Sequence, residues 1–370
     1  MKIVAVGYPL MHSRQYRILE SKKHEVHIIT PKKWQNVFRL PKDYDSIHFH
    51  FCDDKFHGNA SLYFIPCVSK YVKELKPDLI FTMAEPWSLL VTNNEMIANK
   101  FKIPHVIAMW ENLDKDLPFP FSRFEKRNIK GIEGLINGNP EGWEIYKRKG
   151  AKCLHHIDPL GAVDIKEFSK KKGDLRKELK LKGKKVILYA GRFVPQKGLL
   201  YIINSMGEVL KNVDNAHYLF VGKGELEERL KEEIRKKGVE DRVTIINWVP
   251  REKMPMLYNT ADVFLYPSYR TKKWAEQFGF ALIEAMACET PVITASSGSI
   301  PWVVGDAAIV VKPKNSDELG KAIVKVLTDD KLRRRLIEKG KKRAKYFSVE
   351  EVRKRYFKFF EDVAKKCRKE

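Results

Sequence analysis

Short apolar, β-branched runs alternate with longer amphipathic segments along the whole chain. In the first half such runs lie at 2–6, 25–30, 46–51, 79–82, 105–109, 134–136 and 152–155. A second series lies at 185–190, 217–221, 243–246, 263–266, 291–294 and 308–311. This alternation is typical of a parallel sheet covered by helices. The chain is therefore predicted to be α/β, with two doubly wound, Rossmann-like domains.

The two series are separated by a segment that breaks the pattern. It runs from His156 to Phe168, contains Asp158-Pro159 and Gly161, and is followed by a highly charged stretch. We expect an N-terminal domain over 1–160 and a C-terminal domain over 161–348. The last predicted helix, from Val349 to about Lys366, carries aromatic residues that need a partner surface, so residues 349–370 are expected to pack back on the first domain. Another helix is expected over 63–75.

Composition limits the location of the protein. No run of 18 apolar residues is present and the first residues lack signal-peptide flanks, so the chain is expected to be cytoplasmic. Its five cysteines have no CxxC spacing, which favours reduced thiols over a disulfide framework or a zinc ribbon. Abundant Lys and Glu beside only four Gln suggest a thermophile.

The net charge of +23 is compatible with phosphate-rich ligands, an anionic membrane surface, nucleic acid, or simply a lysine-rich solvated surface. Two stretches concentrate the charge. The first holds Arg14, Arg17, Lys22, Lys23, Lys32, Lys33, Arg39 and Lys42, and the second is KLRRRLIEKGKKRAK, 331–345. The second stretch has helical spacing without interleaved aromatics, which indicates a surface helix and argues against stacking on nucleic acid.

The most informative window is 271–296, TKKWAEQFGFALIEAMACETPVITAS. Apart from Glu284, residues 278–288 are almost wholly apolar and predict a buried helix. A buried carboxylate is costly unless it is paired, so a ligand is the favoured explanation for Glu276 and Glu284. Eight residues of helix would separate them by about 12 Å, the span from a sugar across a diphosphate to a ribose. In the structural alternative, Glu276 caps the helix and Glu284 meets a lysine.

The start of the same helix suits an anion. Unpaired N–H groups of Gln277, Phe278 and Gly279 would offer donors to phosphate or sugar oxygens. Gly279 has no side chain to keep a ligand away from the backbone.

Two glycine-containing turns follow predicted strands. In YAGRFVPQKGL, 189–199, Gly191 turns the chain and places Arg192 and Lys197 at a strand-to-helix junction, where doubly wound folds bind ligands. Both cations suit phosphate oxygens. In FVGKGELEERL, 220–230, Gly222 and Gly224 flank Lys223. The third glycine of a dinucleotide fingerprint is missing, so this turn is interpreted as a contact near a nucleotide base.

Taken together and in this order, GRFVPQKG, VGKGE, INWVPREKMPMLYNTADVFLYPS and EQFGFALIEAMACETPVI resemble the donor domain of the family-4 retaining glycosyltransferases of GT-B fold. The resemblance is close over about 185–315 and extends only in outline elsewhere. The two glutamates, with seven residues between them, and the following PVI are its specific part. It implies two Rossmann-like domains facing each other across a cleft.

The resemblance also implies roles for individual residues. Glu276 would contact hydroxyls of the donor sugar, and the amides of Phe278 and Gly279 would bind sugar or phosphate. Glu284 would accept both ribose hydroxyls. Arg192 and Lys197 would neutralise the leaving diphosphate. The base would be flanked by Gly222, Lys223 and the segment around Val249.

The N-terminal half departs from the family pattern. Gly7 is followed by Tyr8 instead of a second glycine, and Trp110-Glu111 stands where members often carry a histidine that meets the donor sugar. Glu111 is therefore the candidate polar contact or base. No metal is expected, because two cations can hold the diphosphate and Asp114-Lys115-Asp116 is interpreted as a solvated loop.

His48, His50 and Cys52 alternate along one predicted strand, so their side chains share one face. With Asp53 and His57 they could form a metal site, but packing beneath a helix is the favoured interpretation because spacing alone is a weak indication.

The sequence thus predicts a metal-independent, retaining transferase that moves a hexose from a UDP- or GDP-sugar to a glycan or lipid-linked acceptor, without a further cofactor. Contact of the first basic stretch with an anionic membrane, at its inner face, is an added hypothesis. One alternative is a nucleotide-sugar epimerase or hydrolase on the same fold that uses Glu85, Glu111 and His12. The other is a non-catalytic protein that binds membrane or nucleic acid.

Overall fold

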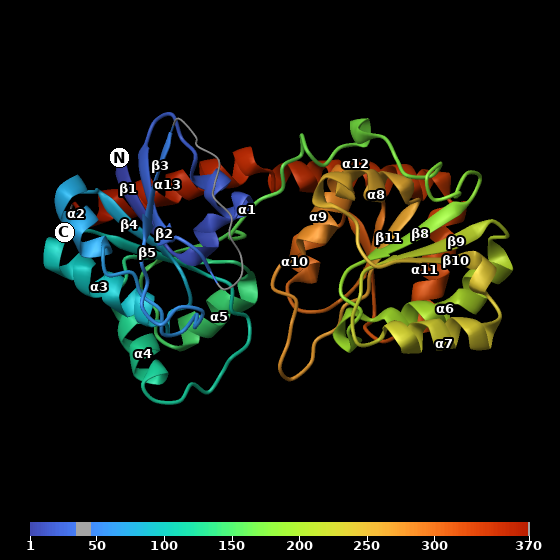
Figure 1. Cartoon of the computed structure of the whole chain (residues 1–370), viewed down its shortest axis with the longest axis horizontal. Helices are drawn as coiled ribbons and strands as arrows, with labels where there is room; N and C mark the ends of the chain where they lie inside the picture. Colours follow the sequence, from blue (N-terminus) through green and yellow to red (C-terminus); the bar gives the residue numbers. More distant parts are fainter. Residues whose placement is uncertain (35–45, 369–370) are drawn as a thin grey trace. The chain divides into compact units, whose positions relative to one another are not determined.

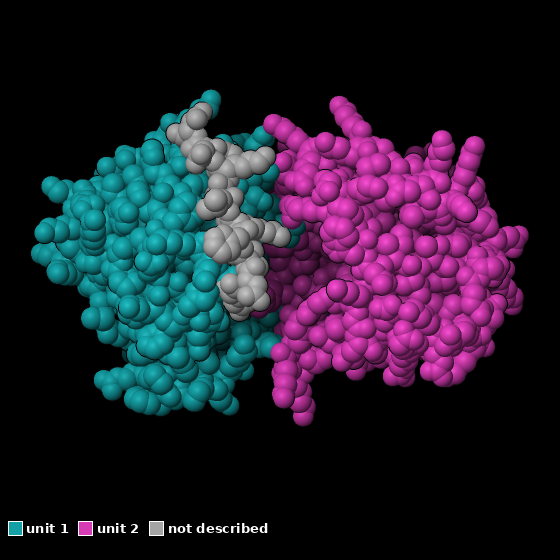
Figure 2. All heavy atoms as spheres, viewed as in Figure 1, with its two compact units in different colours: residues 1–162, 349–370 teal, residues 163–348 magenta. Residues whose placement is uncertain are grey.

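The structure is a computed structural model that describes residues 1–34 and 46–368. The chain forms two compact units (Figure 2). The first unit consists of Met1–Ala162 together with Val349–Glu370, and the second is Val163–Ser348. Within the described residues, no helix is both long and apolar enough to cross a membrane.

Each unit is built on one parallel sheet (Figure 1). The first has the order β3-β2-β1-β4-β5-β6-β7 and the second β10-β9-β8-β11-β12-β13. The strands of the first unit are β1 (Lys2–Val6), β2 (Glu25–Pro31), β3 (Ile47–Cys52), β4 (Leu79–Met83), β5 (His105–Met109), β6 (Gly134–Asn137) and β7 (Leu154–Ile157). Those of the second are β8 (Lys185–Ala190), β9 (Ala216–Val221), β10 (Val243–Ile246), β11 (Val263–Tyr266), β12 (Val292–Ala295) and β13 (Ala308–Val311).

Helices connect consecutive strands and supply the amphipathic layers. In the first unit they are α1 (Ser13–Tyr16), α2 (Val68–Leu75), α3 (Leu89–Phe101), α4 (Phe121–Gly131), α5 (Pro140–Arg148) and α13 (Val349–Cys367). In the second they are α6 (Leu199–Asn212), α7 (Glu227–Lys237), α8 (Met254–Thr260), α9 (Phe280–Ala287), α10 (Ile300–Val304), α11 (Ser316–Thr328) and α12 (Asp330–Tyr346). Several begin at a side-chain cap, such as Asn315, whose carbonyl accepts from the Glu318 amide at 3.0 Å.

The predicted strands are present because their apolar runs are buried on both faces of a parallel sheet, as in β5, where all five residues are buried. Two expected elements differ at their ends. The helix expected over 63–75 begins only at Val68, because Pro66 disfavours helical geometry in the residue before it. The strand expected over 152–155 lies two residues later, at Leu154–Ile157.

One prediction about the cysteines is wrong. Cys52, the last residue of β3, forms a disulfide with Cys67, the residue before α2. The remaining cysteines Cys153, Cys288 and Cys367 are free thiols. The sequence separation of 15 gave no indication of this pair, because the fold of the intervening loop brings the two residues together.

The last helix completes the core of the first unit. The aromatic residues of α13 pack with side chains of β1 and β4, and Phe81 lies 5.1 Å from Phe360 between ring centroids. A polar anchor accompanies this packing. Asp158, fully buried after β7, accepts two hydrogen bonds of 2.7 Å from the Arg355 guanidinium, and the Tyr356 hydroxyl donates to the Pro159 carbonyl at 3.0 Å.

We expect Asp158→Ala to lower the free energy of unfolding by about 2–3 kcal/mol, because it removes the buried carboxylate that pairs with the Arg355 guanidinium. Because Arg355 is partly exposed to water, this loss of stability is at or below the low end of the range found when a buried ion pair is broken. Urea unfolding of the full chain measures it. Lys354→Ala, on the same helix but at an exposed ion pair, is the matched control and should change stability by less than about 0.5 kcal/mol. Equal effects of the two variants would contradict this role of Asp158.

Candidate functional site

The turn after β8 places two cations at the carboxyl edge of the second sheet. Arg192 is exposed and, among the described residues, its guanidinium has no ion-pair partner. Lys197 ends a short 3-10 helix over Pro195–Lys197 and is 8% exposed. Gly198 follows with φ 78°, and a Cβ there would lie 2.2 Å from the Pro267 carbonyl oxygen. Only glycine therefore fits the close approach that fixes the position of Lys197.

Glu276 lies outside the helix in which it was expected. Gly279 has a left-handed backbone with φ 81°, and α9 begins at the next residue. Glu276 is therefore part of the loop that joins β11 to α9, so helical rise does not apply between Glu276 and Glu284 and their separation cannot be derived from it. The carboxylate is held by its loop and by side chains from the neighbouring strands.

Lys197, Tyr266 and Glu276 form one hydrogen-bonded cluster. The Lys197 ammonium donates to Glu276 Oε2 at 2.6 Å and to the Tyr266 hydroxyl at 3.0 Å. That hydroxyl donates in turn to Glu276 Oε2 at 2.7 Å. The ammonium also lies 4.6 Å from the ring centroid of Trp274. A cation, a carboxylate and two aromatic rings thus share one largely buried place.

Burial sets the protonation of this cluster. It lowers the pKa of the Lys197 ammonium, and the adjacent Glu276 carboxylate opposes that shift. Burial together with the negative charge of Glu276 raises the pKa of the Tyr266 phenol well above its ordinary value. Tyr266 is therefore a neutral hydroxyl that fixes the positions of the two charged groups.

Glu284 lies on α9 as predicted and is 7% exposed. Its Oε2 accepts a hydrogen bond from the Tyr258 hydroxyl at 3.1 Å. In the structural alternative, Glu284 was expected to meet a lysine. The partner observed here is instead the hydroxyl of Tyr258, a residue of α8.

Around the start of α9, the backbone can meet a ligand, whereas the side chain of Phe278 is buried in the core. No side chain caps the helix, whose cap residue is Gly279. The Phe278 ring is 2% exposed and packs on Phe347, with 5.0 Å between ring centroids. Its side chain belongs to the core, so a ligand could meet only its backbone.

The two glycine turns pack against each other. The Gly191 amide donates to the Val221 carbonyl at 2.9 Å, and a Cβ on Gly222 would lie 1.9 Å from the Gly191 carbonyl oxygen. Lys223 is exposed beyond this contact. Val249 is half-buried next to Trp248, whose side chain is 71% exposed. An exposed indole of this kind offers a flat surface on which a base can stack.

Sheet topology explains why distant residues meet. Strands β8 and β11 are hydrogen-bonded neighbours, so the turn that carries Lys197 and the strand end at Tyr266 lie at the same edge. Tyr266 and Trp274 were not identified from the sequence. The position of Tyr266, the last residue of a strand that ends beside Lys197, becomes informative only once the strand order is known.

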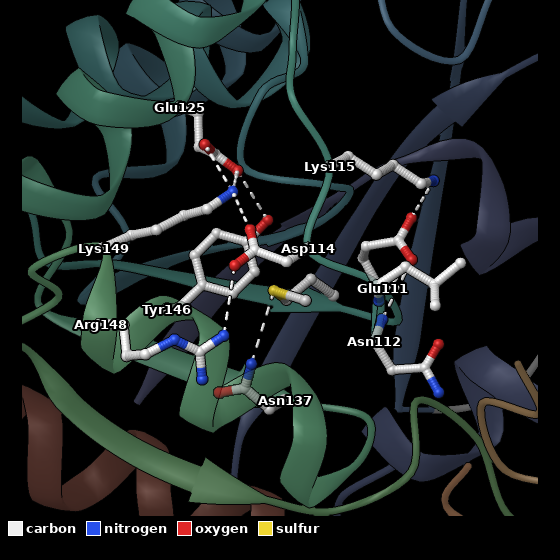
Figure 3. Close-up of polar contacts among 11 residues, drawn as sticks. Glu111, Asn112, Asp114, Lys115, Glu125, Asn137, Tyr146, Arg148 and Lys149 are labelled. Carbon is white, nitrogen blue, oxygen red and sulfur yellow. Dashed lines mark hydrogen bonds and ion pairs between the residues drawn. The ribbon is translucent and has the colours of Figure 1, made fainter. Parts of the chain in front are cut away.

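In the first unit, Glu111 follows β5 and is 7% exposed (Figure 3). Its Oε1 accepts from the amides of Asn112 and Leu113 at 3.1 and 3.0 Å, and its Oε2 accepts from the Lys115 ammonium. Both oxygens therefore hold the loop 111–115 in shape. A role as base would require the Lys115 contact to open.

The loop that contains Asp114 is tied to α5. Asp114 pairs with Arg148 at 3.2 Å and Lys149 at 3.3 Å, and Lys149 also reaches Glu125 at 3.0 Å (Figure 3). The side chain of Asp114 is 53% exposed. These residues form a network of ion pairs at the surface. This agrees with the interpretation of Asp114-Lys115-Asp116 as a solvated loop.

Glu85, which follows β4, is the most perturbed acid of the first unit. Its Oε1 accepts from the Trp110 amide at 3.0 Å, whereas its buried Oε2 has no hydrogen-bond partner among the described residues. Burial raises the pKa of Glu85 to about 7, and the charge of Glu111 adds to the shift. Perturbed carboxyls of this kind are common at functional sites.

The other sequence features have ordinary surroundings. Residues 331–345 lie on α12, with Leu332, Leu336, Gly340 and Ala344 facing inward, as their spacing predicts. In the first basic stretch Lys22, Lys23, Lys32 and Lys33 are exposed and Arg14 and Arg17 half-buried, whereas Arg39 and Lys42 lie outside the described residues.

The five residues considered as a metal set do not come together as such. Cys52 is in the disulfide, Asp53 pairs with Lys32 at 3.0 Å, and His57 pairs with Asp54 at 3.1 Å. Only His48 and His50 remain near each other, through contacts of both rings with His27.

Comparison with known families identifies the second unit. Residues 171–343 match the model of glycosyl transferases group 1. The C-terminal unit belongs to this family. The match includes every residue of the Lys197–Tyr266–Glu276 cluster as well as Arg192 and Glu284.

Curated relatives of this group 1 unit are similar over part of their length. An uncharacterized glycosyltransferase of Methanocaldococcus jannaschii is 32% identical over 160 residues, which is 43% of this chain and 40% of that protein. A GDP-mannose-dependent alpha-(1-6)-phosphatidylinositol monomannoside mannosyltransferase of Mycobacterium tuberculosis is 30% identical over 187 residues, 48% of each protein. The chain spans about half the length of the curated relatives it matches.

Solved structures extend the similarity of fold to the whole chain. A sucrose-phosphate synthase from Thermosynechococcus elongatus superposes with a TM-score of 0.71 at 18% identity and covers 98% of this chain and 99% of that one. The Anabaena protein HepE in complex with UDP has a TM-score of 0.72 at 17% identity, with 98% and 100% covered. The predicted fold class, α/β with two Rossmann-like sheets of GT-B type, is confirmed.

Proposed function

We propose that this chain is a retaining glycosyltransferase that moves a hexose from a nucleoside-diphosphate sugar to a glycan or lipid-linked acceptor. The observation that carries the proposal is the pairing of Lys197 with Glu276 on Tyr266, inside the segment that matches the group 1 family. A buried cation and a carboxylate beside an uncapped helix start provide complementary contacts for the phosphate and sugar parts of such a donor.

The nucleotide end of the donor would be held by hydrogen bonds and stacking. Glu284, buried on α9, would accept hydrogen bonds from the two ribose hydroxyls, and Trp248 beside Val249 offers a ring to the base. The turns around Gly191, Gly222 and Lys223 would lie along the nucleoside. HepE was solved with UDP, and the mycobacterial relative is named for GDP-mannose, so uridine and guanosine donors are both included.

Departure of the diphosphate would be assisted by charge already in place. Negative charge grows on the leaving phosphate in the transition state, and Lys197, Arg192 and the start of α9 are donors fixed in advance. These groups can balance the charge without a metal ion, and the transfer is proposed to be metal-independent on that ground. Retention of configuration is proposed from the resemblance to retaining transferases.

The acceptor would be bound in the first unit by the groups that follow β4 and β5. Glu85 is a carboxyl with a pKa of about 7 that is able to accept the proton of an acceptor hydroxyl, and Glu111 shapes the adjoining loop. The mycobacterial relative acts, by its name, on a phosphatidylinositol mannoside. A lipid-linked acceptor and a peripheral membrane contact remain part of the proposal for that reason.

A thermal-shift screen of nucleoside diphosphates and their sugars tests the donor class, since a ligand that binds the native state raises Tm. Product analysis with and without an acceptor then separates transfer from its alternatives. An isomerised nucleotide sugar would indicate an epimerase, and free sugar formed at the same rate with or without acceptor would indicate a hydrolase. Absence of any Tm shift with all donors would contradict the proposal.

Two variants separate nucleotide binding from turnover. Glu284→Ala is expected to weaken nucleotide binding by roughly 10–100-fold, because hydrogen bonds to a charged group contribute about 1.5–3 kcal/mol. Arg192→Ala is expected to lower kcat by about 10²-fold, the low end of the effect of one fixed donor, since Arg192 is exposed. Calorimetry with the nucleotide and steady-state kinetics measure the two effects. Glu289→Ala, two residues beyond α9, is the matched control, and unchanged values in both test variants would refute these assignments.

A further inference from the structure

A second polar cluster lies on β2 and on its neighbour β3, the edge strand of the first sheet. Strands β2 and β3 are parallel neighbours, and His27 is the direct register partner of His48. Glu25 precedes His27 by two residues, so the two side chains share one face of β2. Among the described strands, β3 has β2 as its single neighbour. Sheet register therefore fixes three metal-binding side chains on one surface.

The ligand atoms of these residues are close together. One donor atom from each of Glu25, His27 and His48 lies within 4.8 Å of the other two. The His27 Nε2 and Glu25 Oε1 atoms are 2.9 Å apart, and the rings of His27 and His48 are stacked with 4.8 Å between centroids. Ligand atoms around one zinc ion at about 2.0–2.2 Å bond length are slightly more than 3 Å apart. Glu25 and His48, both exposed, would rotate to reach that spacing, and the His48 ring would turn out of its stack with His27.

His50 supports this arrangement from behind. Its Nε2 lies 2.9 Å from Nδ1 of His27, and its ring packs 4.2 Å from the ring of Tyr71. With a proton on Nδ1, His27 donates to His50 and presents the lone pair of Nε2 to a metal. Metal-binding histidines commonly donate their second N–H to such a partner.

We propose that Glu25, His27 and His48 bind a divalent transition-metal ion, with Zn²⁺ as the best match to two imidazoles and one carboxylate. Three protein ligands leave one position of a tetrahedral ion for water or an anion. On binding, with the His27 proton held on Nδ1, the ion takes the place of the His27–Glu25 hydrogen bond, and the Lys2 ammonium, 3.4 Å from Glu25, gives up its ion pair. The proposal is independent of the proposed transferase activity.

An entry path is present beside the ligands. A hollow of about 390 Å³ is lined by Glu25 and His48 from the two strands, by Ser46 just before β3, and by residues 21–24. The exposed Lys22 and Lys23 on its rim suit an anion in the fourth coordination position. A bound ion would join β2 to β3 through side chains as well as through the sheet, and would therefore raise Tm.

The test uses the full chain prepared without a histidine tag and treated with a chelator. Isothermal titration with Zn²⁺ alone is expected to show one saturable site, and Co²⁺ is expected to give the visible absorption of a tetrahedral complex. A near-ultraviolet thiolate-to-cobalt band should be absent. This readout distinguishes the proposed site from the free thiols Cys153 and Cys367.

Matched variants locate the site. His50→Phe keeps an aromatic ring against Tyr71 but removes the supporting acceptor, and should weaken Zn²⁺ binding by about 10–100-fold. His48→Ala and Glu25→Gln remove proposed ligands and should weaken it at least as much. His155→Ala, on β7 of the same unit, should leave binding unchanged. Metal-free melting curves show whether each variant is folded.

Three results would overturn the proposal. One is the absence of a saturable heat of Zn²⁺ binding to the wild-type chain. Another is equal affinity of folded His48→Ala and wild type. The third is a cobalt–thiolate band, which would assign the binding to cysteine.

Discussion

Lys197→Ala is expected to lower kcat by about 10³-fold, the upper end of the effect of removing one preorganised donor. Lys197 is placed for this role by Gly198 and Tyr266, and its ammonium lies in a largely buried environment, where a charge interacts more strongly than in water. Without it, charge developing on the departing phosphate would be met by the exposed Arg192 and the start of α9. The measurement is the steady-state rate of hexose transfer at saturating donor.

The matched control is Lys211→Ala, an exposed lysine on α6 of the same unit, which should leave kcat unchanged. Because Lys197→Ala also leaves Glu276 without its cation, its melting curve is needed alongside the kinetics. A folded Lys197→Ala variant with kcat within threefold of wild type would remove Lys197 from the mechanism.

Glu276→Gln is expected to strengthen the binding of a nucleoside diphosphate and to lower kcat/KM for the complete donor. Without donor, the Glu276 carboxylate neutralises the Lys197 ammonium at 2.6 Å. Glutamine removes this competing charge, so a nucleoside diphosphate without sugar should bind about tenfold more tightly, a gain of about 1.4 kcal/mol. The complete donor loses the charged acceptor for its sugar hydroxyls, and kcat/KM should fall by about 10²–10³-fold.

Calorimetry with UDP and GDP, followed by kinetics with the corresponding sugars, measures both effects of Glu276→Gln. Glu289→Gln changes the same charge at a half-buried position after α9 and serves as the control. If the diphosphate bound more weakly to Glu276→Gln than to wild type, the ion pair would not compete with phosphate. The roles given to Lys197 and Glu276 would then need revision.

The fold was predictable where one signal dominates. The runs 105–109, 185–190 and 263–266 match their strands residue for residue, because strands buried on both faces consist of continuous apolar sequence. Helix starts were less certain, because backbone geometry decides them. Gly279 in a left-handed conformation shortens α9, and Pro66 delays α2, although apolar residues precede both.

The candidate site was predictable as a set of residue types but not as a set of contacts. Arg192, Lys197, Glu276 and Glu284 were each identified from charge in an apolar or glycine-rich context. That Lys197 pairs with Glu276, 79 residues away, depends on β8 and β11 being neighbours. The Cys52–Cys67 disulfide and the contact of His27 with His48 likewise depend on pairing of distant segments, which local sequence does not encode.

The position of α13 has a consequence for synthesis of the protein. The first unit takes part of its core from residues 349–367, which the ribosome makes only after the whole second unit. While the second unit is being translated, the surface that Tyr356 and Phe360 will cover has no partner and presents apolar side chains to the surroundings. The first unit therefore cannot complete its core until the whole second unit has been translated.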